Sequence, residues 1–282
     1  MATTTAPAPR GPLSALPPVK GKAGLGGALR SEWTKLRSVR STYWSLFAFA
    51  VIGVGLAAGV SAGRASEINS HHRAAAGIDA TRTPLIMLLL LGALVIAVLG
   101  ALVITSEYST GMIRTSLTAQ PRRSVVYTAK VVVFTVMALV ASVVVAFAAF
   151  FVGQALLSSA GVSVTLAHPN TLRAIIGSAL YVTAAGLFAF GVGAIVRHTA
   201  GAIAISVAVL FVFQILVNFL PQTWQDDVIR WLPTSSWQPL SATVDTGKDP
   251  HLFSLWPQFG VTVGWAVLLL ITGAILLRKR DA

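Results

Sequence analysis

Residues 84–105 read PLIMLLLLGALVIAVLGALVIT, a stretch of 22 residues without a charged side chain. An α-helix rises about 1.5 Å per residue, so about 20 apolar residues are needed to cross the hydrocarbon core of a membrane. The stretch therefore predicts a membrane-spanning helix. Other segments meet the same criterion, and the six predicted spans are residues 43–63, 84–105, 126–157, 172–196, 200–220 and 255–277.

The composition of the whole chain agrees with this prediction. Of its 282 residues, 55% are hydrophobic and 11% are charged, whereas a soluble domain carries about 25% charged residues. We predict an all-α fold, a six-span transmembrane helix bundle. The chain has no cysteine, which excludes disulfides, cysteine-based zinc sites and thiol catalysis. Residues 1–27 are proline-rich and aperiodic, so we predict a disordered cytoplasmic tail before a membrane domain over residues 28–282.

Residues 28–41, ALRSEWTKLRSVRS, predict a basic amphipathic helix that lies in the membrane interface. Basic side chains, among them Lys35 and Arg37, occupy mostly the faces away from its apolar stripe. The apolar residues at helical spacing are Leu29, Trp33 and Leu36. The alternative is a solvated extension of the first span.

The basic residues are distributed unevenly among the predicted loops. Of 21 Lys and Arg residues, 14 lie on the side that holds both termini and 6 on the other, with Lys130 just inside the third span. Because basic loops stay in the cytoplasm, we predict a multi-pass protein of the cell membrane with both termini cytoplasmic. Since the basic residues border apolar runs, they indicate contact with the lipid bilayer and no nucleic-acid partner.

The loop between the second and third spans, residues 105–130, reads TSEYSTGMIRTSLTAQPRRSVVYTAK. Its Glu107, Gly111 and Arg114 recur at spacings that place them on one face of a predicted helix. That helix would end before Pro121, because proline disfavours helical backbone in its predecessor. A short cytoplasmic helix here is a suitable lever for a soluble partner. The alternative is a hydrated loop, and composition alone does not decide between them.

This loop resembles the type-2 ATP-binding-cassette (ABC) permeases, whose pattern here is Glu, Gly four residues later, then Leu, Pro, Arg and Lys. The matching residues are Glu107, Gly111, Leu117, Pro121, Arg123 and Lys130. Residues 31–44 (SEWTKLRSVRSTYW), 194–205 (AIVRHTAGAIAI) and 278–282 (RKRDA) resemble actinobacterial members. The resemblance extends over residues 29–282. One departure is Ser-Leu at residues 116–117, where the family often has paired leucines.

The resemblance implies a permease subunit without its own motor. ATP and Mg²⁺ would bind to a separate ABC ATPase subunit, and two permeases, identical or homologous, would pair with two ATPases. The coupling helix between spans two and three would dock into a groove of the ATPase. The coupling residues would be Glu107, Gly111, Arg114, Leu117, Pro121 and Arg123. In agreement, the sequence lacks a G-x-x-x-x-G-K-[ST] phosphate loop, and we expect no catalytic residue, cofactor or metal in this chain.

Two further features concern the outer side and the span interiors. A short helix over residues 223–232 would place Trp224 and Trp231 on one face, and we predict an external lid that dips into the outer leaflet. The alternative is a packed loop with incidental tryptophans. Polar residues inside the spans would line a cavity or join helices, and they are Gln154, Gln214 and Asn218.

The predicted function is export of an apolar or amphipathic compound. Export is the usual direction in the family that the chain resembles, and no acidic residue lies near the middle of a predicted span. That absence argues against a stand-alone secondary carrier, which needs an ionisable relay there. The lack of a catalytic set within a span argues against a six-span membrane enzyme. These two functions are the alternatives.

Overall fold

The structure is a computed structural model that describes residues 24–71, 78–112, 122–243 and 254–279. Within these ranges the chain is helical and contains no β-strand. The segments long and apolar enough to cross a membrane are Arg40–Ser70, Arg82–Ser109, Arg123–Ala160, Thr171–Val196, Thr199–Val217 and Leu255–Lys279. The predicted all-α class with six spans is confirmed, although the fifth helix ends before the predicted residue 220.

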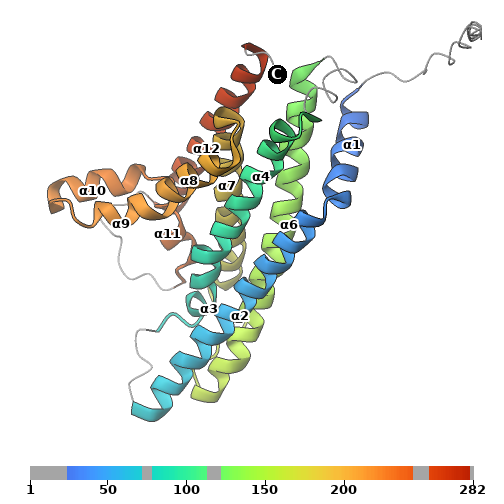
Figure 1. Cartoon of the computed structure of the whole chain (residues 1–282). Helices are drawn as coiled ribbons and strands as arrows, with labels where there is room; N and C mark the ends of the chain where they lie inside the picture. The colour runs from blue at the N-terminus through green and yellow to red at the C-terminus, as the bar shows by residue number, and fades with distance from the viewer. Residues whose placement is uncertain (1–23, 72–77, 113–121, 244–253, 280–282) are drawn as a thin grey trace, which may run out of the picture.

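The helices follow one another as an elongated bundle (Figure 1). In chain order they are α1 (Leu25–Ser38), α2 (Arg40–His71), α3 (Arg82–Met87), η1 (Leu88–Gly92), α4 (Ala93–Ser109), α6 (Arg123–Leu157), η2 (Ser158–Ala160), α7 (Thr171–Val196), α8 (Thr199–Val207), η3 (Ala208–Val212), α9 (Phe213–Val217), α10 (Gln222–Trp231), α11 (Trp237–Ser241) and α12 (Leu255–Lys279). The π-helical turns η1 and η3 lie inside spans two and five.

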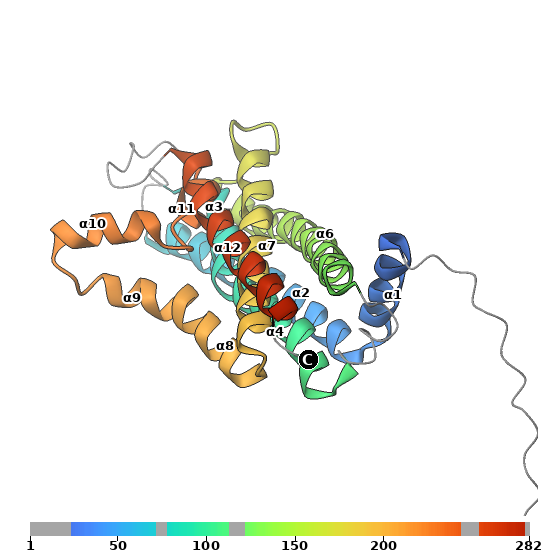
Figure 2. The ribbon, with the colours of Figure 1, turned by 90° about the horizontal axis from the view of Figure 1, so that it is seen from above.

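The fourth span, α7, is the centre of the bundle. Its most apolar part is 78% buried, whereas the corresponding parts of spans one, five and six are each 22% buried. Figure 2 shows α7 surrounded by α4, α6 and α12, and it packs against all three. Small residues, which bring helix backbones close together, are frequent along α7.

The closest approach of α7 to α4 depends on two glycines. A Cβ atom on Gly100 of α4 would lie 2.3 Å from the carbonyl oxygen of Gly186 on α7. A Cβ on Gly186 would lie 2.7 Å from Ile96 Cγ2. Because the first obstacle is backbone, a side chain at position 100 would force the two helices apart.

We therefore expect Gly100→Ala to destabilise the bundle by about 1–3 kcal/mol, the usual effect of overpacking. In a helix without such a contact, the same exchange is favourable by about 1 kcal/mol. Gly63→Ala on α2 is the matched control, because no atom lies within 4 Å of a Cβ placed on it. Thermal unfolding in detergent should show opposite signs for the two variants, and equal shifts would contradict the proposed contact.

The fifth span departs from the bundle. Helix α8 begins in contact with α4 and α7, and Figures 1 and 2 show α9 leading away from the other helices and α10 returning towards them. The end of α10 is fixed to α12 by two hydrogen bonds. Gln258 Nε2 donates to the carbonyl oxygen of Arg230 at 2.8 Å, and Trp265 Nε1 donates to that of Trp231 at 2.8 Å.

After α10 the chain turns inward and buries a polar segment that ends at Thr243. Asp79 holds this end, because its Oδ1 accepts from Thr243 Oγ1 at 2.8 Å and its Oδ2 accepts from Thr243 N at 2.8 Å. Within the segment, Ser236 shares a hydrogen bond of 2.7 Å with Thr262 of α12. These bonds join the loop before α3, the segment after α10, and α12.

Candidate functional site

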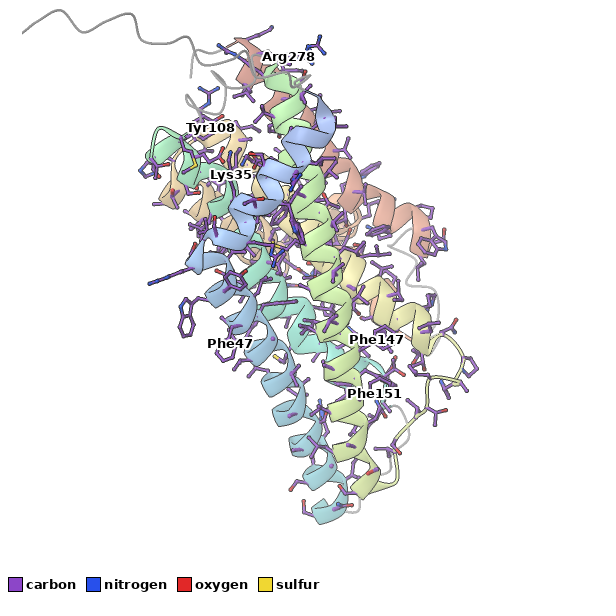
Figure 3. The ribbon with its side chains drawn as sticks, turned by 90° about the vertical axis from the view of Figure 1, so that its right-hand side faces the viewer. Lys35, Phe47, Tyr108, Phe147, Phe151 and Arg278 are labelled. Atoms are coloured by element: carbon purple, nitrogen blue, oxygen red, sulfur yellow. The ribbon has the colours of Figure 1, made fainter. Side chains whose placement is uncertain are left out.

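Four charged side chains from three helices meet near the end of the bundle that carries both termini. We call Glu32 and Lys35 of α1, Glu107 of α4 and Lys130 of α6 the charge cluster. Lys130 Nζ donates to Glu107 Oε1 at 2.7 Å and also to Glu32 Oε2. Lys35 Nζ donates to Glu32 Oε1 at 2.7 Å and to Glu107 Oε1 at 3.1 Å. Figure 3 shows Lys35 on α1 where that helix runs obliquely beside α6.

The charge cluster is buried and formally neutral. Glu32, Glu107 and Lys130 expose 4%, 6% and 5% of their surfaces, respectively. Removing charges from water is costly, and only pairing with opposite charges at hydrogen-bond distance offsets the cost. The two acids and two bases provide that pairing, so the arrangement is stable only while α1, α4 and α6 stay in contact.

Lys35 lies at the edge of the charge cluster and supplies its second positive charge. Burial opposes its protonation, but the hydrogen bond to Glu32 and the charges of Glu107 and Glu32 outweigh burial and raise its pKa above the usual value. The ammonium group is therefore protonated throughout the physiological range. Any stability that it supplies is present below its ordinary pKa and is lost only when the pH rises through its raised pKa.

The N-terminal helix forms where it was predicted, with shifted bounds. Residues 1–23 of the predicted tail lie outside the described residues, and α1 begins at Leu25. The buried residue of α1 is Glu32, whereas Trp33 is 44% exposed and Arg37 is exposed. Trp33 is thus left on an exposed face of α1, and the charge cluster determines that Glu32 faces inward. The position of α1 in the membrane interface stays a prediction.

Glu107, predicted as a coupling residue that is either a polar contact or a local helix support, points inward to Lys130 and Lys35. Its second carboxylate oxygen, Oε2, is buried and has no hydrogen-bond partner among the described residues. The predicted shared helical face of Glu107 and Gly111 is wrong. Helix α4 ends at Ser109, and Gly111 has a φ of +70°, which leaves the helical path.

Gly111 terminates α4 and supplies a hydrogen bond to one of the carbonyl groups at the end of this helix. Its N–H donates to the carbonyl oxygen of Tyr108 at 3.3 Å, and no atom lies within 4 Å of a Cβ placed on it. Left-handed backbone favours glycine at this position after a helix. The predicted coupling residues Arg114, Leu117 and Pro121 lie outside the described residues, so their contacts stay predictions.

The last of the predicted coupling residues, Arg123, joins α6 to the end of α12. Its Nη1 donates to the carbonyl oxygen of Leu277 at 3.0 Å, and Arg197 Nη2 donates to that of Leu276 at 3.2 Å. Cationic groups at a helix C-terminus satisfy free carbonyls and the helix dipole. The Arg197 guanidinium also stacks over the Tyr108 ring at 5.0 Å from its centre. The ends of α4, α6, α7 and α12 are thus linked beside the charge cluster.

The polar residues predicted inside the spans have different roles. Gln154 is buried, and it joins two loops because its Nε2 donates to Ala80 O at 2.7 Å and its Oε1 accepts from Val164 N at 2.8 Å. Asn218, predicted inside the fifth span, lies just after its end at Val217, where it is exposed and donates to the carbonyl oxygen of Gln214 at 3.1 Å. A cavity lined by these residues stays a prediction.

The predicted tryptophan-bearing helix is present as α10, one residue longer at its start and one shorter at its end. Trp224 and Trp231 expose 69% and 61% of their surfaces. The amphipathic character of the sequence was sufficient to place this helix. Whether it acts as a lid stays a prediction. In the described ranges, no group of three or more His, Cys, Asp or Glu side chains could hold a metal ion.

Sequence analysis did not identify the charge cluster as a unit. Two signals were available: Glu32 is an acid in an otherwise basic helix, and Lys130 is a base within an apolar span. Such residues usually have buried partners of opposite charge. Their pairing across 98 positions depends on how α1 packs against α6, which no local pattern specifies.

A comparison with known families gives a match over most of the chain. The family described as "ABC-2 family transporter protein" matches residues 29–282. The match includes the charge cluster, all six spans and α10. No curated protein matches the chain.

Proposed function

Because the match covers residues 29–282, the chain belongs to the ABC-2 family of transporter proteins, and on this premise we propose that it is the permease subunit of an ATP-driven exporter. It is a multi-pass membrane protein with six apolar helices. ATP and Mg²⁺ bind to a separate ATPase chain in this proposal, since the sequence has no phosphate loop. The exported compound is apolar or amphipathic.

The observation that carries the proposal is the charge cluster at the end of spans two and three. It connects α1, α4 and α6 close to Met112 and Arg122, the described residues that flank positions 113–121. A force applied to that loop reaches both flanking helices within a few residues. Since the cluster is buried and neutral, its members move together or lose their pairing. The geometry therefore supports a proposal in which α1, α4 and α6 move as one unit when an ATPase pushes or pulls on this end of the bundle.

The proposed mechanism is a shift between two access states. The ATPase pair binds one state of the permease better when it holds ATP and the other state better afterwards, and this differential binding moves the equilibrium. The loop that contains Arg114 and Leu117 contacts the ATPase, and Gly111 allows the chain to turn into it. Glu107 supports this contact from inside through Lys130 and Lys35.

The apolar or amphipathic nature of the cargo is supported by the charges of the spans. Among the described spans, the acidic residues are Glu67 and Glu107, and both lie near span ends. Spans without an acidic residue near their middle, and with Lys130 of span three neutralised by Glu32 and Glu107, suit a cargo that itself is mostly apolar. The distribution of basic residues supports a position in the cell membrane with both termini cytoplasmic.

A second permease, identical or homologous, completes the proposed transporter. The first span supports the pairing of two permeases, because its most apolar part is only 22% buried within the chain. On its exposed side, Gly55 and Gly59 are four residues apart, and no atom lies within 4 Å of a Cβ placed on either. Small residues at this spacing permit close approach of another helix.

The test is purification from the native membrane in mild detergent, followed by native mass spectrometry. We expect a complex of two permeases with two copies of a soluble chain that carries a phosphate-loop motif. Repeated recovery of the chain alone, under conditions that keep a known ABC transporter intact, would contradict the proposal. It would favour a stand-alone carrier or a membrane enzyme.

A further inference from the structure

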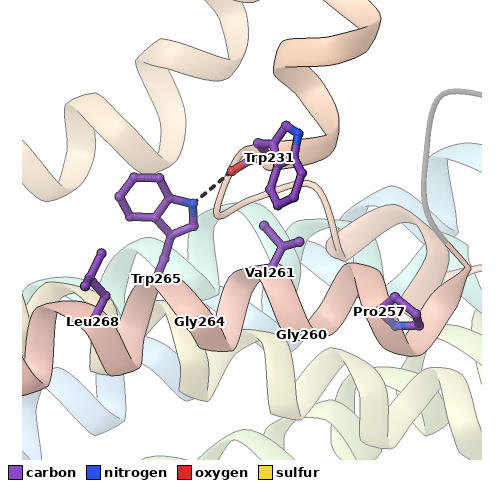
Figure 4. A pocket seen from close by; sticks show the side chains of 7 residues that line it. All are labelled: Trp231, Pro257, Gly260, Val261, Gly264, Trp265 and Leu268. Atoms are coloured by element: carbon purple, nitrogen blue, oxygen red, sulfur yellow. Dashed lines mark hydrogen bonds between the residues drawn. The ribbon is translucent and has the colours of Figure 1, made fainter.

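An open groove runs along α12 beside the end of α10 (Figure 4). Its volume is about 530 Å³, and seven residues line it. Pro257 and Leu268 lie at its two ends, as Figure 4 shows. Their separation along a helix corresponds to about 17 Å. One leaflet of the hydrocarbon core is about 15 Å thick. The groove is therefore about as long as a leaflet is deep.

Two glycines leave the floor of the groove open. Gly260 and Gly264 are one helical turn apart on the same face of α12, and no atom lies within 4 Å of a Cβ placed on either. Each glycine inside a helix costs about 1 kcal/mol relative to alanine. A ligand can thus rest directly on the helix backbone at two successive turns.

The walls of the groove favour hydrocarbon. Trp265 and Trp231 contribute aromatic surface, and Trp265 Nε1 already donates to the carbonyl oxygen of Trp231 at 2.8 Å. A polar ligand would lose its hydration without gaining a hydrogen bond from this indole. An alkyl chain incurs no such loss and gains contact with apolar surface.

The size of the groove suits a small ligand better than another protein. Its volume lies within the range of about 300–1,000 Å³ that is usual for small-molecule sites. A stable protein interface needs about 20–30 residues from each partner, whereas seven residues line this groove. It is also formed by two helices of one chain and opens sideways, since Trp231 and Trp265 are 61% and 41% exposed.

We propose that this groove binds one acyl chain of a membrane phospholipid. The ligand reaches it laterally from the bilayer, because the exposed indoles border the side of the bundle rather than an interior passage. The acyl chain lies along Gly260 and Gly264 between the two indoles. This binding site is independent of the proposed transport activity, so either proposal can fail alone.

The experiment uses a phosphatidylcholine with a photoreactive diazirine near the end of one acyl chain. The full-length protein is reconstituted into phosphatidylcholine vesicles that contain a small fraction of this probe, and it is then irradiated and digested. Labelled peptides are quantified by mass spectrometry. We expect α12 to be labelled around Gly260 and Gly264, above the level on exposed faces of α6.

Gly264→Leu places a side chain in the groove at a position where the added Cβ meets no atom within 4 Å. We expect it to reduce labelling of α12 roughly tenfold, which corresponds to about 1.4 kcal/mol of lost burial. Gly63→Leu on α2 adds the same side chain at another open position, and we expect α12 labelling to be unchanged. Gly260→Leu is the second groove variant, used if Gly264→Leu does not retain the wild-type unfolding temperature.

Two results would overturn the inference. Labelling of α12 that is the same in the groove variants and in Gly63→Leu would show only general contact with surrounding lipid. Labelling by a photoreactive fatty acid, without labelling by the phospholipid probe, would show a site for a single-chain amphiphile instead.

Discussion

Lys130→Met is expected to destabilise the folded bundle by about 3–5 kcal/mol, the usual result of removing one partner of a buried ion pair. Methionine keeps most of the apolar stem of lysine but removes the ammonium group that contacts Glu32 and Glu107. Two buried carboxylates then share Lys35 alone. The midpoint of thermal unfolding in detergent measures the loss.

A second variant separates charge imbalance from lost packing. Glu32→Gln combined with Lys130→Met restores neutrality, because Glu107 and Lys35 remain paired at 3.1 Å. We expect this double variant to recover at least half of the stability that Lys130→Met loses. Lys279→Met, at an exposed position of α12, is the control for loss of a surface ammonium. A double variant less stable than Lys130→Met would contradict a role in charge balance.

Gly111→Val is expected to reduce the permease-dependent stimulation of the partner ATPase about tenfold or more, with little change in the unfolding temperature of the bundle. Valine is β-branched and resists the φ of +70° that Gly111 adopts. The backbone strain of valine at this φ is about 1–2 kcal/mol, and the chain relieves it by changing the conformation of residue 111, which displaces the loop that follows. The measurement is ATPase activity of the complex reconstituted in vesicles.

Gly161→Val is the matched control for this prediction. Gly161 has a φ of +71°, and like Gly111 it has no atom within 4 Å of a Cβ placed on it. It follows η2 on the loop between α6 and α7, at the opposite end of α6 from Lys130. Both variants carry similar backbone strain, but only one lies at the proposed coupling loop. Equal ATPase stimulation in the two variants would remove the basis for a coupling role of Gly111.

The spans could be predicted because their signal is local. A run such as residues 84–105 is long enough to cross a membrane whatever its neighbours are, and the structure places a helix there. Helix α10 was equally accessible, since its tryptophans and the following proline are close in sequence. The end of α4 was missed although Gly111 is the residue type that most often follows a helix.

The charge cluster could not be derived in the same way. The spacing of Leu29, Trp33 and Leu36 predicts an amphipathic helix in the membrane interface, but it does not reveal that pairing with Lys130 turns Glu32 inward. The deciding interaction lies on a helix far away in sequence. The π-helical turns η1 and η3 could not be predicted either, because the additional residue that each turn contains has no sequence signature in an apolar run.

The charge cluster also fixes an order of events during biosynthesis. The ribosome releases Glu32 and Lys35 first, and because they are three residues apart on α1, their charges balance within that helix. Glu107 follows at the end of the second span, and Lys130 arrives last of the four, inside the third. Entry of the third span into the membrane is therefore the step that closes the cluster. Until that moment the charge cluster has two acids and one base.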